Sequence, residues 1–154
     1  MSSVLAAALA VLGLLGGGDA RVLTRCGLAR VLVWYGTPRD LVPDFVCLAE
    51  AESSLDTAKV ATTDGSARNG YGIFQINDTE WCSSSGINRC NVRCEELLAD
   101  DIRQSLACAN LIYSNALRYS ESGFEPWLGW KESCRGQDLT KFMDDQTTGK
   151  ACLY

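Results

Sequence analysis

The stretch that decides the fold is residues 64–77, which read DGSARNGYGIFQIN. Gly, Ser, Asn and Asp punctuate its first half, and the second half, YGIFQI, is rich in the aromatic and β-branched residues typical of a strand. The dipeptide Asn69-Gly70 is a common hairpin-turn sequence. We therefore predict a small, polar hairpin region between residues 62 and 76.

Helical patterns lie on both sides of this region. Residues 24–36, TRCGLARVLVWYG, carry an apolar stripe at helical spacing that ends at Gly36. Residues 42–54, VPDFVCLAEAESS, begin near Pro43, a favoured first helical residue. The apolar face of this second helix runs through Phe45, Leu48 and Ala49, and Glu52 continues the same stripe.

The longest predicted helix spans residues 100–117, DDIRQSLACANLIYSNAL, with an apolar face that starts at Ile102 and Leu106. Asp101 is its predicted cap, and Gln104 is the capping-box partner. We expect a further helix to start at Pro126 in EPWLGW, and a last short turn in residues 138–145, DLTKFMDD. A β region between helical segments indicates an α+β fold.

Residues 1–20 differ from the rest of the chain and predict a signal peptide. The run VLAAALAVLGLLGGG is apolar, and Gly18 and Ala20 supply small residues at the −3 and −1 positions of a cleavage site. The alternative is a membrane anchor, but the run falls short of the roughly 20 residues that a span needs. We therefore predict a secreted protein whose single domain covers residues 21–154.

Cysteine content and charge limit the function classes. All eight cysteines lie in the predicted mature part, and an even number in a small secreted chain indicates four disulfides, although spacing alone leaves their pairing open. The chain has no histidine, which excludes His-based catalytic triads and His-containing metal sites. The net charge of −5 argues against nucleic acid and against anionic membranes as partners.

Glu52 is the first candidate for chemistry. A carboxyl group on an apolar helical stripe is placed against apolar neighbours, and desolvation then raises its pKa, which suits a general acid. The alternative is an ordinary solvated glutamate at the end of a helix. Glu50, two positions earlier, points elsewhere and is predicted to lie on the surface.

Several stretches together resemble the C-type lysozymes, whose fold is shared with α-lactalbumin: RCGLARVL, VCLAEAESSLDT, DGSARNGYGIFQINDTEWC, CNVRCEELLADDI and PWLGWKESC. The cysteine spacing is specific to this family, with three residues between Cys90 and Cys94 and thirteen between Cys94 and Cys108. The segment YGIFQIN, followed five residues later by Cys82, is close to a family signature. The resemblance covers the whole predicted mature chain.

The resemblance implies a helical lobe and a small antiparallel β lobe on either side of a cleft for β-1,4-linked amino sugars. It also implies the disulfide pairs Cys26–Cys152, Cys47–Cys134, Cys82–Cys94 and Cys90–Cys108. In lysozymes, one carboxylic acid protonates the leaving oxygen, and a second carboxylate acts as the nucleophile or stabilises the oxocarbenium ion. Glu52 matches the position of the acid.

The second carboxylate should directly precede Tyr71, but Gly70 stands there, after Asn69. Neither residue can act as the nucleophile. The loop from Glu52 has a length that is normal for the family, so a shifted alignment does not recover an aspartate. Asp64 is a poor substitute, because its position before a glycine indicates a turn.

Other family positions imply a partly retained sugar site, with substrate-binding residues Asn69, Gln75, Asn77, Trp81 and Trp127. Trp81 is interpreted as a stacking platform, with a core tryptophan as the alternative. A position that is often aromatic in the family is occupied here by Glu80. The segment Asn77-Asp78-Thr79 is also an N-glycosylation sequon, and we expect Asn77 to be unmodified.

Calcium-binding members of the family use an acidic loop before the long helix. Here only Asp100 and Asp101 stand in that region, while Ala99, Gln104 and Ser105 replace possible ligands. Calcium takes six to eight oxygen ligands, so we predict no metal site. We also predict no cofactor.

Three functions remain open. The first is a secreted, monomeric protein that binds peptidoglycan or a chitin-like oligosaccharide, with muramidase activity lost or strongly reduced. The second is a weak but active muramidase in which Glu52 assists direct attack by water. The third is a non-catalytic role with a protein partner, as in α-lactalbumin or the sperm lysozyme-like proteins.

Overall fold

The computed structural model describes residues 21–62 and 68–153. The predicted signal peptide therefore lies outside the described residues. The helices and strands, in chain order, are α1 (Arg25–Trp34), α2 (Val42–Ser53), β1 (Val60–Thr62), β2 (Asn69–Tyr71), β3 (Ile76–Asn77), the 3-10 helix η1 (Cys94–Leu98), α3 (Arg103–Ala116), α4 (Leu128–Ser133) and the 3-10 helix η2 (Thr140–Phe142).

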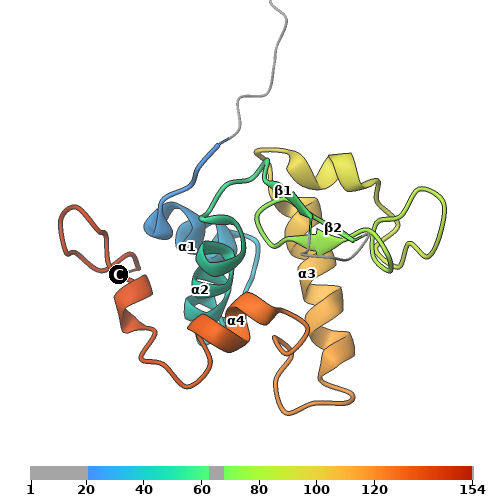
Figure 1. Cartoon of the computed structure of the whole chain (residues 1–154). Helices are drawn as coiled ribbons and strands as arrows, with labels where there is room; N and C mark the ends of the chain where they lie inside the picture. The colour runs from blue at the N-terminus through green and yellow to red at the C-terminus, as the bar shows by residue number, and fades with distance from the viewer. Residues whose placement is uncertain (1–20, 63–67, 154) are drawn as a thin grey trace, which may run out of the picture.

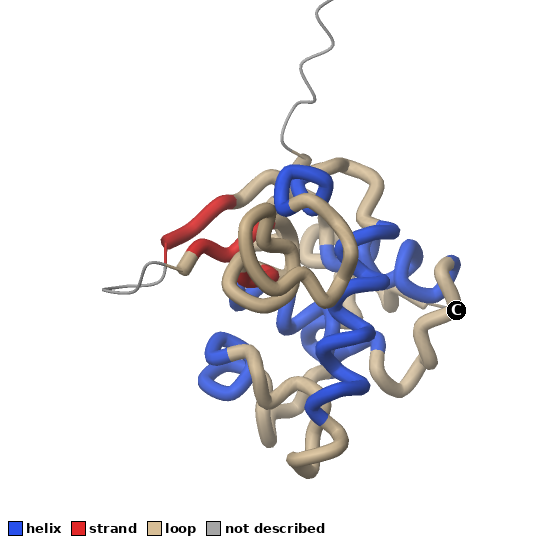
Figure 2. Tube along the Cα trace, turned by 90° about the vertical axis from the view of Figure 1, so that its right-hand side faces the viewer, coloured by secondary structure: helices blue, strands red, loops and turns tan. Residues whose placement is uncertain are grey.

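The elements form a helical part and a smaller part built on the sheet, as the α+β prediction requires. Figure 1 shows α1, α2 and α4 gathered on one side, and β1, β2 and η1 on the other. α3 contacts both η1 and β3, so it supports the sheet from below. Figure 2 shows the strands together at one edge of the molecule, next to a group of loops. No helix in the described ranges is long and apolar enough to cross a membrane.

The core is centred on α2, because apolar side chains cover most of its circumference. Pro43 lies in the first turn as predicted, and Asp44 adds a carboxylate where the helix dipole favours one. The helix ends at Ser54, whose φ of 56° lies in the left-handed region that terminates helices. The residues of α2 that are buried are Val42, Phe45, Val46, Cys47, Leu48, Ala49 and Ser53.

The three strands form one antiparallel sheet in the order β1-β2-β3. The register pairs Thr62 with Asn69 and Ala61 with Gly70. The prediction that Asn69-Gly70 forms the hairpin turn is therefore wrong, because both residues belong to β2. Residues 63–67, between the two strands in the sequence, lie outside the described residues. Gly70 is buried between two neighbouring strands, where a residue without a side chain is readily accommodated.

Two helix starts differ from the predictions. α3 begins at Arg103 with Ile102 as its N-cap, and no side chain caps it. The carboxylate of Asp101 instead accepts a hydrogen bond from the backbone N–H of Arg103 at 3.1 Å, so the predicted capping box with Gln104 is absent. α4 begins at Leu128, two residues after Pro126. The apolar face predicted for α3 is confirmed, since Ile102, Leu106, Ala109 and Ile112 are buried.

Four disulfides join distant parts of the fold, and they are the four pairs that the resemblance implies. Cys26–Cys152 ties α1 to the C-terminal segment, and Cys47–Cys134 joins α2 to the end of α4. Cys82–Cys94 and Cys90–Cys108 hold the long loop after the sheet against η1 and α3. This loop contains little regular structure, so its two bridges do much to define its path.

The contact between the sheet and η1 requires a glycine at position 72. Gly72 has a φ of +71°, and a Cβ built there would lie 2.1 Å from the carbonyl oxygen of Leu97. Gly72→Ala should therefore combine left-handed strain with overpacking, at a cost of about 2–5 kcal/mol in the free energy of unfolding. Chemical denaturation measures this loss.

Gly136→Ala is the matched control for that experiment. Gly136 has a similar φ of +69°, but nothing lies within 4 Å of its ideal Cβ position. In Gly136→Ala, the free energy of unfolding should fall only by the cost of the left-handed backbone strain, about 1–2 kcal/mol. Equal losses in the two variants would contradict the close packing of β2 against η1.

Candidate functional site

Glu52 lies in the last turn of α2 and is half-buried. Its Oε1 accepts a hydrogen bond of 2.9 Å from the backbone N–H of Gly129, in the first turn of α4. Burial raises the pKa of Glu52, while the bond from Gly129 and the positive charge of Lys59 oppose that shift, and Glu132 adds to it. The carboxyl group is thus in the environment that the sequence predicted, and not that of a solvated surface glutamate.

The close approach of α4 to Glu52 depends on the glycine at position 129. A Cβ built on Gly129 would lie 2.8 Å from Oε1 of Glu52. Just before it, Trp127 is the N-cap of α4, and its indole Nε1 donates a 2.8 Å hydrogen bond to the carbonyl oxygen of Phe74. Trp127 therefore links α4 to the segment between β2 and β3. It is 5% exposed, so it acts as a wall of the site and offers sugars little free surface.

Lys59 faces the same region, which sequence reasoning missed. Its ammonium donates a 2.8 Å hydrogen bond to the backbone carbonyl of Glu52. Lys59 directly precedes β1, and its own carbonyl oxygen accepts a 2.8 Å hydrogen bond from the backbone N–H of Gly72, next to β2. Lys59 is therefore bonded both to the end of α2 and to the segment that follows Gly70.

Gln75 occupies the space beside Gly70. A Cβ at position 70 would lie 2.8 Å from Oε1 of Gln75 and 3.1 Å from its Cβ. The amide Nε2 of Gln75 donates to the carbonyl oxygens of Lys59, at 3.0 Å, and Gly72, at 2.8 Å. Gln75 thus connects the Lys59 backbone to the surroundings of Gly70. In this conformation both hydrogen bonds from the Gln75 amide go to the protein's own backbone.

The other two predicted amides are also held within the protein. Asn69 donates from its backbone N–H and from Nδ2 to the carboxylate of Asp78, at 3.1 and 2.9 Å. The Oδ1 of Asn77 accepts three bonds, from the N–H and hydroxyl of Thr79 and from the N–H of Glu80. Asn69 lies in β2 and Asn77 in β3, and these contacts fix the orientation of both side chains.

Trp81 is a correction to the prediction. It is 6% exposed and belongs to the hydrophobic core, and the guanidinium of Arg89 lies over its ring, 5.4 Å from the centroid. A stacking platform needs an open aromatic face, and this face is covered. The alternative of a core tryptophan describes the structure better.

The acidic loop before α3 makes contacts that compete with metal binding. Asp100 accepts a 3.2 Å hydrogen bond from the hydroxyl of Thr57. Asp101 accepts from Arg103 and from the hydroxyl of Tyr35, and the bonds from Arg103 lower the pKa of Asp101 to about 2. Within residues 21–62 and 68–153, no three His, Cys, Asp or Glu side chains are arranged to hold a metal ion.

The sequence profile of the C-type lysozyme/alpha-lactalbumin family matches residues 21–145. The chain belongs to this family. It is 43% identical to a lysozyme of Bombyx mori over 122 residues, which cover 78% of this chain and 84% of the silkworm protein. It is 41% identical to lysozyme C of Penaeus merguiensis, with 86% of each chain covered.

The fold of a solved lysozyme from Litopenaeus vannamei is also similar, with a TM-score of 0.74 at 35% identity. The match covers 80% of this chain and 96% of the shrimp chain. The C-type lysozyme fold predicted from the sequence is therefore confirmed. In this family member, α2, the start of α4 and the sheet bring together Glu52, Gly129, Lys59, Gln75 and Gly70.

The environment of Glu52 predicts a distinctive pH dependence of stability. An unfolded glutamate ionises near pH 4.3, and burial raises the pKa of Glu52 in the folded state. The folded state therefore holds the proton more tightly, and Glu52 lowers stability as the pH rises through the folded pKa. Glu52→Gln, which keeps an oxygen for Gly129, should be more stable than wild type at pH 7.

The higher stability of Glu52→Gln relative to wild type should vanish below pH 4, where Glu52 is protonated in both the folded and the unfolded state. Denaturation curves at pH 3.5 and pH 7 measure it. Glu50→Gln, two residues away in the same helix, is the control, because it removes the ion pair with Arg25 and should lower stability at pH 7. A Glu52→Gln variant less stable than wild type at pH 7 would contradict the desolvation of Glu52.

The contacts of Asp100 and Asp101 support the prediction that the protein needs no calcium. We expect the melting temperature to be the same in EDTA and in millimolar calcium chloride, as measured by circular dichroism. A fall in EDTA that calcium reverses would show that the loop rearranges to bind the ion.

Proposed function

We propose that this protein binds peptidoglycan or a related β-1,4-linked amino-sugar polymer, and that its muramidase activity is lost or strongly reduced. The observation that carries the proposal is the set of residues in and around the Glu52 site. The acid is present, but Gly70 occupies the position that the family fills with the second carboxylate, and Lys59 places a cation beside Glu52.

The electrostatics of glycoside hydrolysis explain why this change matters. Positive charge develops on the sugar ring in the oxocarbenium-like transition state, and a carboxylate across from the acid stabilises it or attacks it. Without that carboxylate, the transition state loses its main anionic partner. The ammonium of Lys59 opposes the developing charge and so raises the barrier further.

A weak muramidase is the second candidate, and the surroundings of Glu52 favour it. Burial raises the pKa of Glu52, and the bond from Gly129 fixes its carboxyl group, as a general acid requires. Glu52 could protonate the leaving oxygen while water attacks directly. Each loss of ~1.4 kcal/mol in transition-state stabilisation costs tenfold in rate, so we expect such activity to be low.

The proposed ligand follows from family membership and from the polar groups near Glu52. The proposed substrate contacts are still Asn69, Gln75 and Asn77, which would bind through backbone groups or after their side chains rearrange. Trp127 forms a wall beside them. Four disulfides suit an oxidising, extracellular compartment. This supports secretion through the predicted signal peptide, and we propose a monomer.

The direct test restores the missing carboxylate. Gly70→Asp is compared with wild type in a turbidity assay on bacterial cell walls, and Gly70→Asn is the matched control. Both variants add a Cβ that displaces Gln75, but only aspartate adds charge. We expect Gly70→Asp to clear cell walls at least about tenfold faster than wild type and Gly70→Asn. Adding Lys59→Met should increase the rate further.

Binding is measured in parallel by sedimentation with insoluble peptidoglycan and chitin. Wild type and Glu52→Gln should both bind, because Glu52→Gln removes the acid's proton and leaves the other groups in place. Lysis by wild type at a rate like that of Gly70→Asp would contradict the loss of catalysis. A failure to bind either polymer would contradict the binding role and favour a protein partner.

A further inference from the structure

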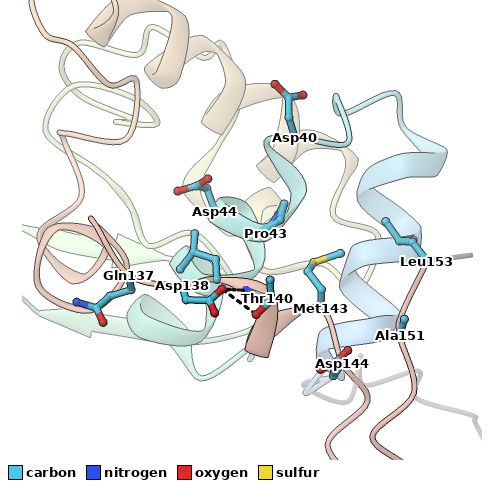
Figure 3. Close-up of a pocket in the computed structure, with 11 residues that line it drawn as sticks. Asp40, Pro43, Asp44, Gln137, Asp138, Thr140, Met143, Asp144, Ala151 and Leu153 are labelled. Carbon is cyan, nitrogen blue, oxygen red and sulfur yellow. Dashed lines mark hydrogen bonds between the residues drawn. The ribbon is translucent and has the colours of Figure 1, made fainter.

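A second concave surface lies away from the Glu52 region, between the start of α2 and the C-terminal segment. It has a volume of about 550 Å³, within the roughly 300–1,000 Å³ typical of ligand pockets. Figure 3 shows its lining. We call it the acidic groove and define it by four aspartates, Asp40, Asp44, Asp138 and Asp144, around an apolar floor of Pro43, Leu139, Met143 and Leu153.

The floor of the acidic groove is apolar because three segments meet there. Pro43 comes from α2, Leu139 and Met143 flank η2, and Leu153 follows the last disulfide. Leu139, Met143 and Leu153 are only half-buried, and each packs against the core with part of its surface. The groove thus presents free apolar surface that a ligand can cover.

The rim of the groove carries negative charge without a matching cation. None of the groove-lining residues is a lysine or arginine, and none of the four aspartates takes part in an ion pair within the described residues. Asp44 accepts a 2.9 Å bond from the indole Nε1 of Trp130, and Asp138 accepts from the N–H and hydroxyl of Thr140.

Arg39, next to Asp40 in the sequence, is exposed and forms no ion pair with the four aspartates among the described residues, and two cations near Asp138 have other partners. Arg135 pairs with Glu125, and the Nζ of Lys141 lies over the ring of Phe142, 5.1 Å from its centroid, although Lys141 still contributes to the low pKa of Asp138. Burial raises the pKa of Asp44, and the hydrogen bond from Trp130 opposes that shift. A positively charged ligand would complement this rim.

The carboxylates surround the groove and do not converge on one point. Figure 3 shows Asp40 and Asp144 at opposite ends, with Asp44 and Asp138 along one side. The described residues contain no group of three such side chains that could hold a metal ion. The charge pattern therefore fits several cations spread around an apolar centre better than it fits a single ion.

We propose that the acidic groove binds a short basic peptide segment in which lysine or arginine alternates with apolar side chains. The apolar side chains cover Leu139, Met143 and Leu153, and the cations reach the aspartates on the rim. This site shares no lining residue with the Glu52 region. A peptide in the groove would therefore not compete for the residues around Glu52.

The test uses fluorescence anisotropy with three labelled peptides and the full secreted protein. Lys-Leu-Lys-Leu-Lys-Leu is the probe, Glu-Leu-Glu-Leu-Glu-Leu reverses its charge, and Lys-Ser-Lys-Ser-Lys-Ser keeps the charge without the apolar residues. We expect saturable binding of the first peptide only. A chitin oligosaccharide should not displace it.

The variant for this test is Asp40→Asn/Asp144→Asn, because neither carboxylate accepts a side-chain hydrogen bond among the described residues, so the fold should be unaffected. Two exposed ion-pair contributions are removed, and the affinity should fall about three- to tenfold. The control with equal net charge is Glu95→Gln/Glu121→Gln, on exposed positions outside the groove, which should bind like wild type.

Four results would overturn the proposal. Equal loss in both double variants would show that only net charge matters. Equal binding of the serine peptide would show that the apolar floor is not used. Displacement by the oligosaccharide would place the peptide in the Glu52 region, while absence of binding would leave the groove without this ligand.

Discussion

The contact between α2 and α4 is the constraint on which the rest of this structure depends. Three links join the two helices at successive turns of α2: the bond between Asp44 and Trp130, the disulfide Cys47–Cys134, and the bond between Glu52 and Gly129. Asp44, in the first link, lines the acidic groove, and the bond from Gly129, the last link, fixes the carboxyl group of Glu52. Because the disulfide lies between them, both surfaces are held by the same covalent tie.

Much of the fold could be predicted from the sequence, because periodicity reports which faces are buried. The stripes of α2 and α3 are buried as expected, and the position of Glu52 on one of them correctly indicated desolvation. The stripe predicted for α1 is buried only at Leu28 and Leu32, and Tyr35 at its end is exposed. The disulfide pairing could not come from spacing, and only the family resemblance supplied it. The family motifs singled out Glu52 and Gly70, which the structure places in α2 and β2.

The errors arose where local preference competes with tertiary contacts. Asn69-Gly70 has turn chemistry, but strand pairing with β1 and the side chain of Gln75 place Gly70 inside the sheet. Trp81 matches a sugar-contacting position, yet the loop closed by disulfides brings Arg89 over its ring. Gly129 has no local signal, since its role is to let α4 approach a residue 77 positions away. Such contacts become visible only when the chain is folded.

The structure combines the C-type lysozyme fold with a half-buried Glu52 at the end of α2, a cation beside it at Lys59, and Gly70 in β2. The most direct measurement incubates wild-type protein with a chitin hexasaccharide, following binding by calorimetry and products by mass spectrometry in the same samples. The account predicts saturable binding with cleavage at most a small fraction of that by an active family member, such as the Bombyx mori lysozyme, run in parallel. Cleavage at a comparable rate would contradict it.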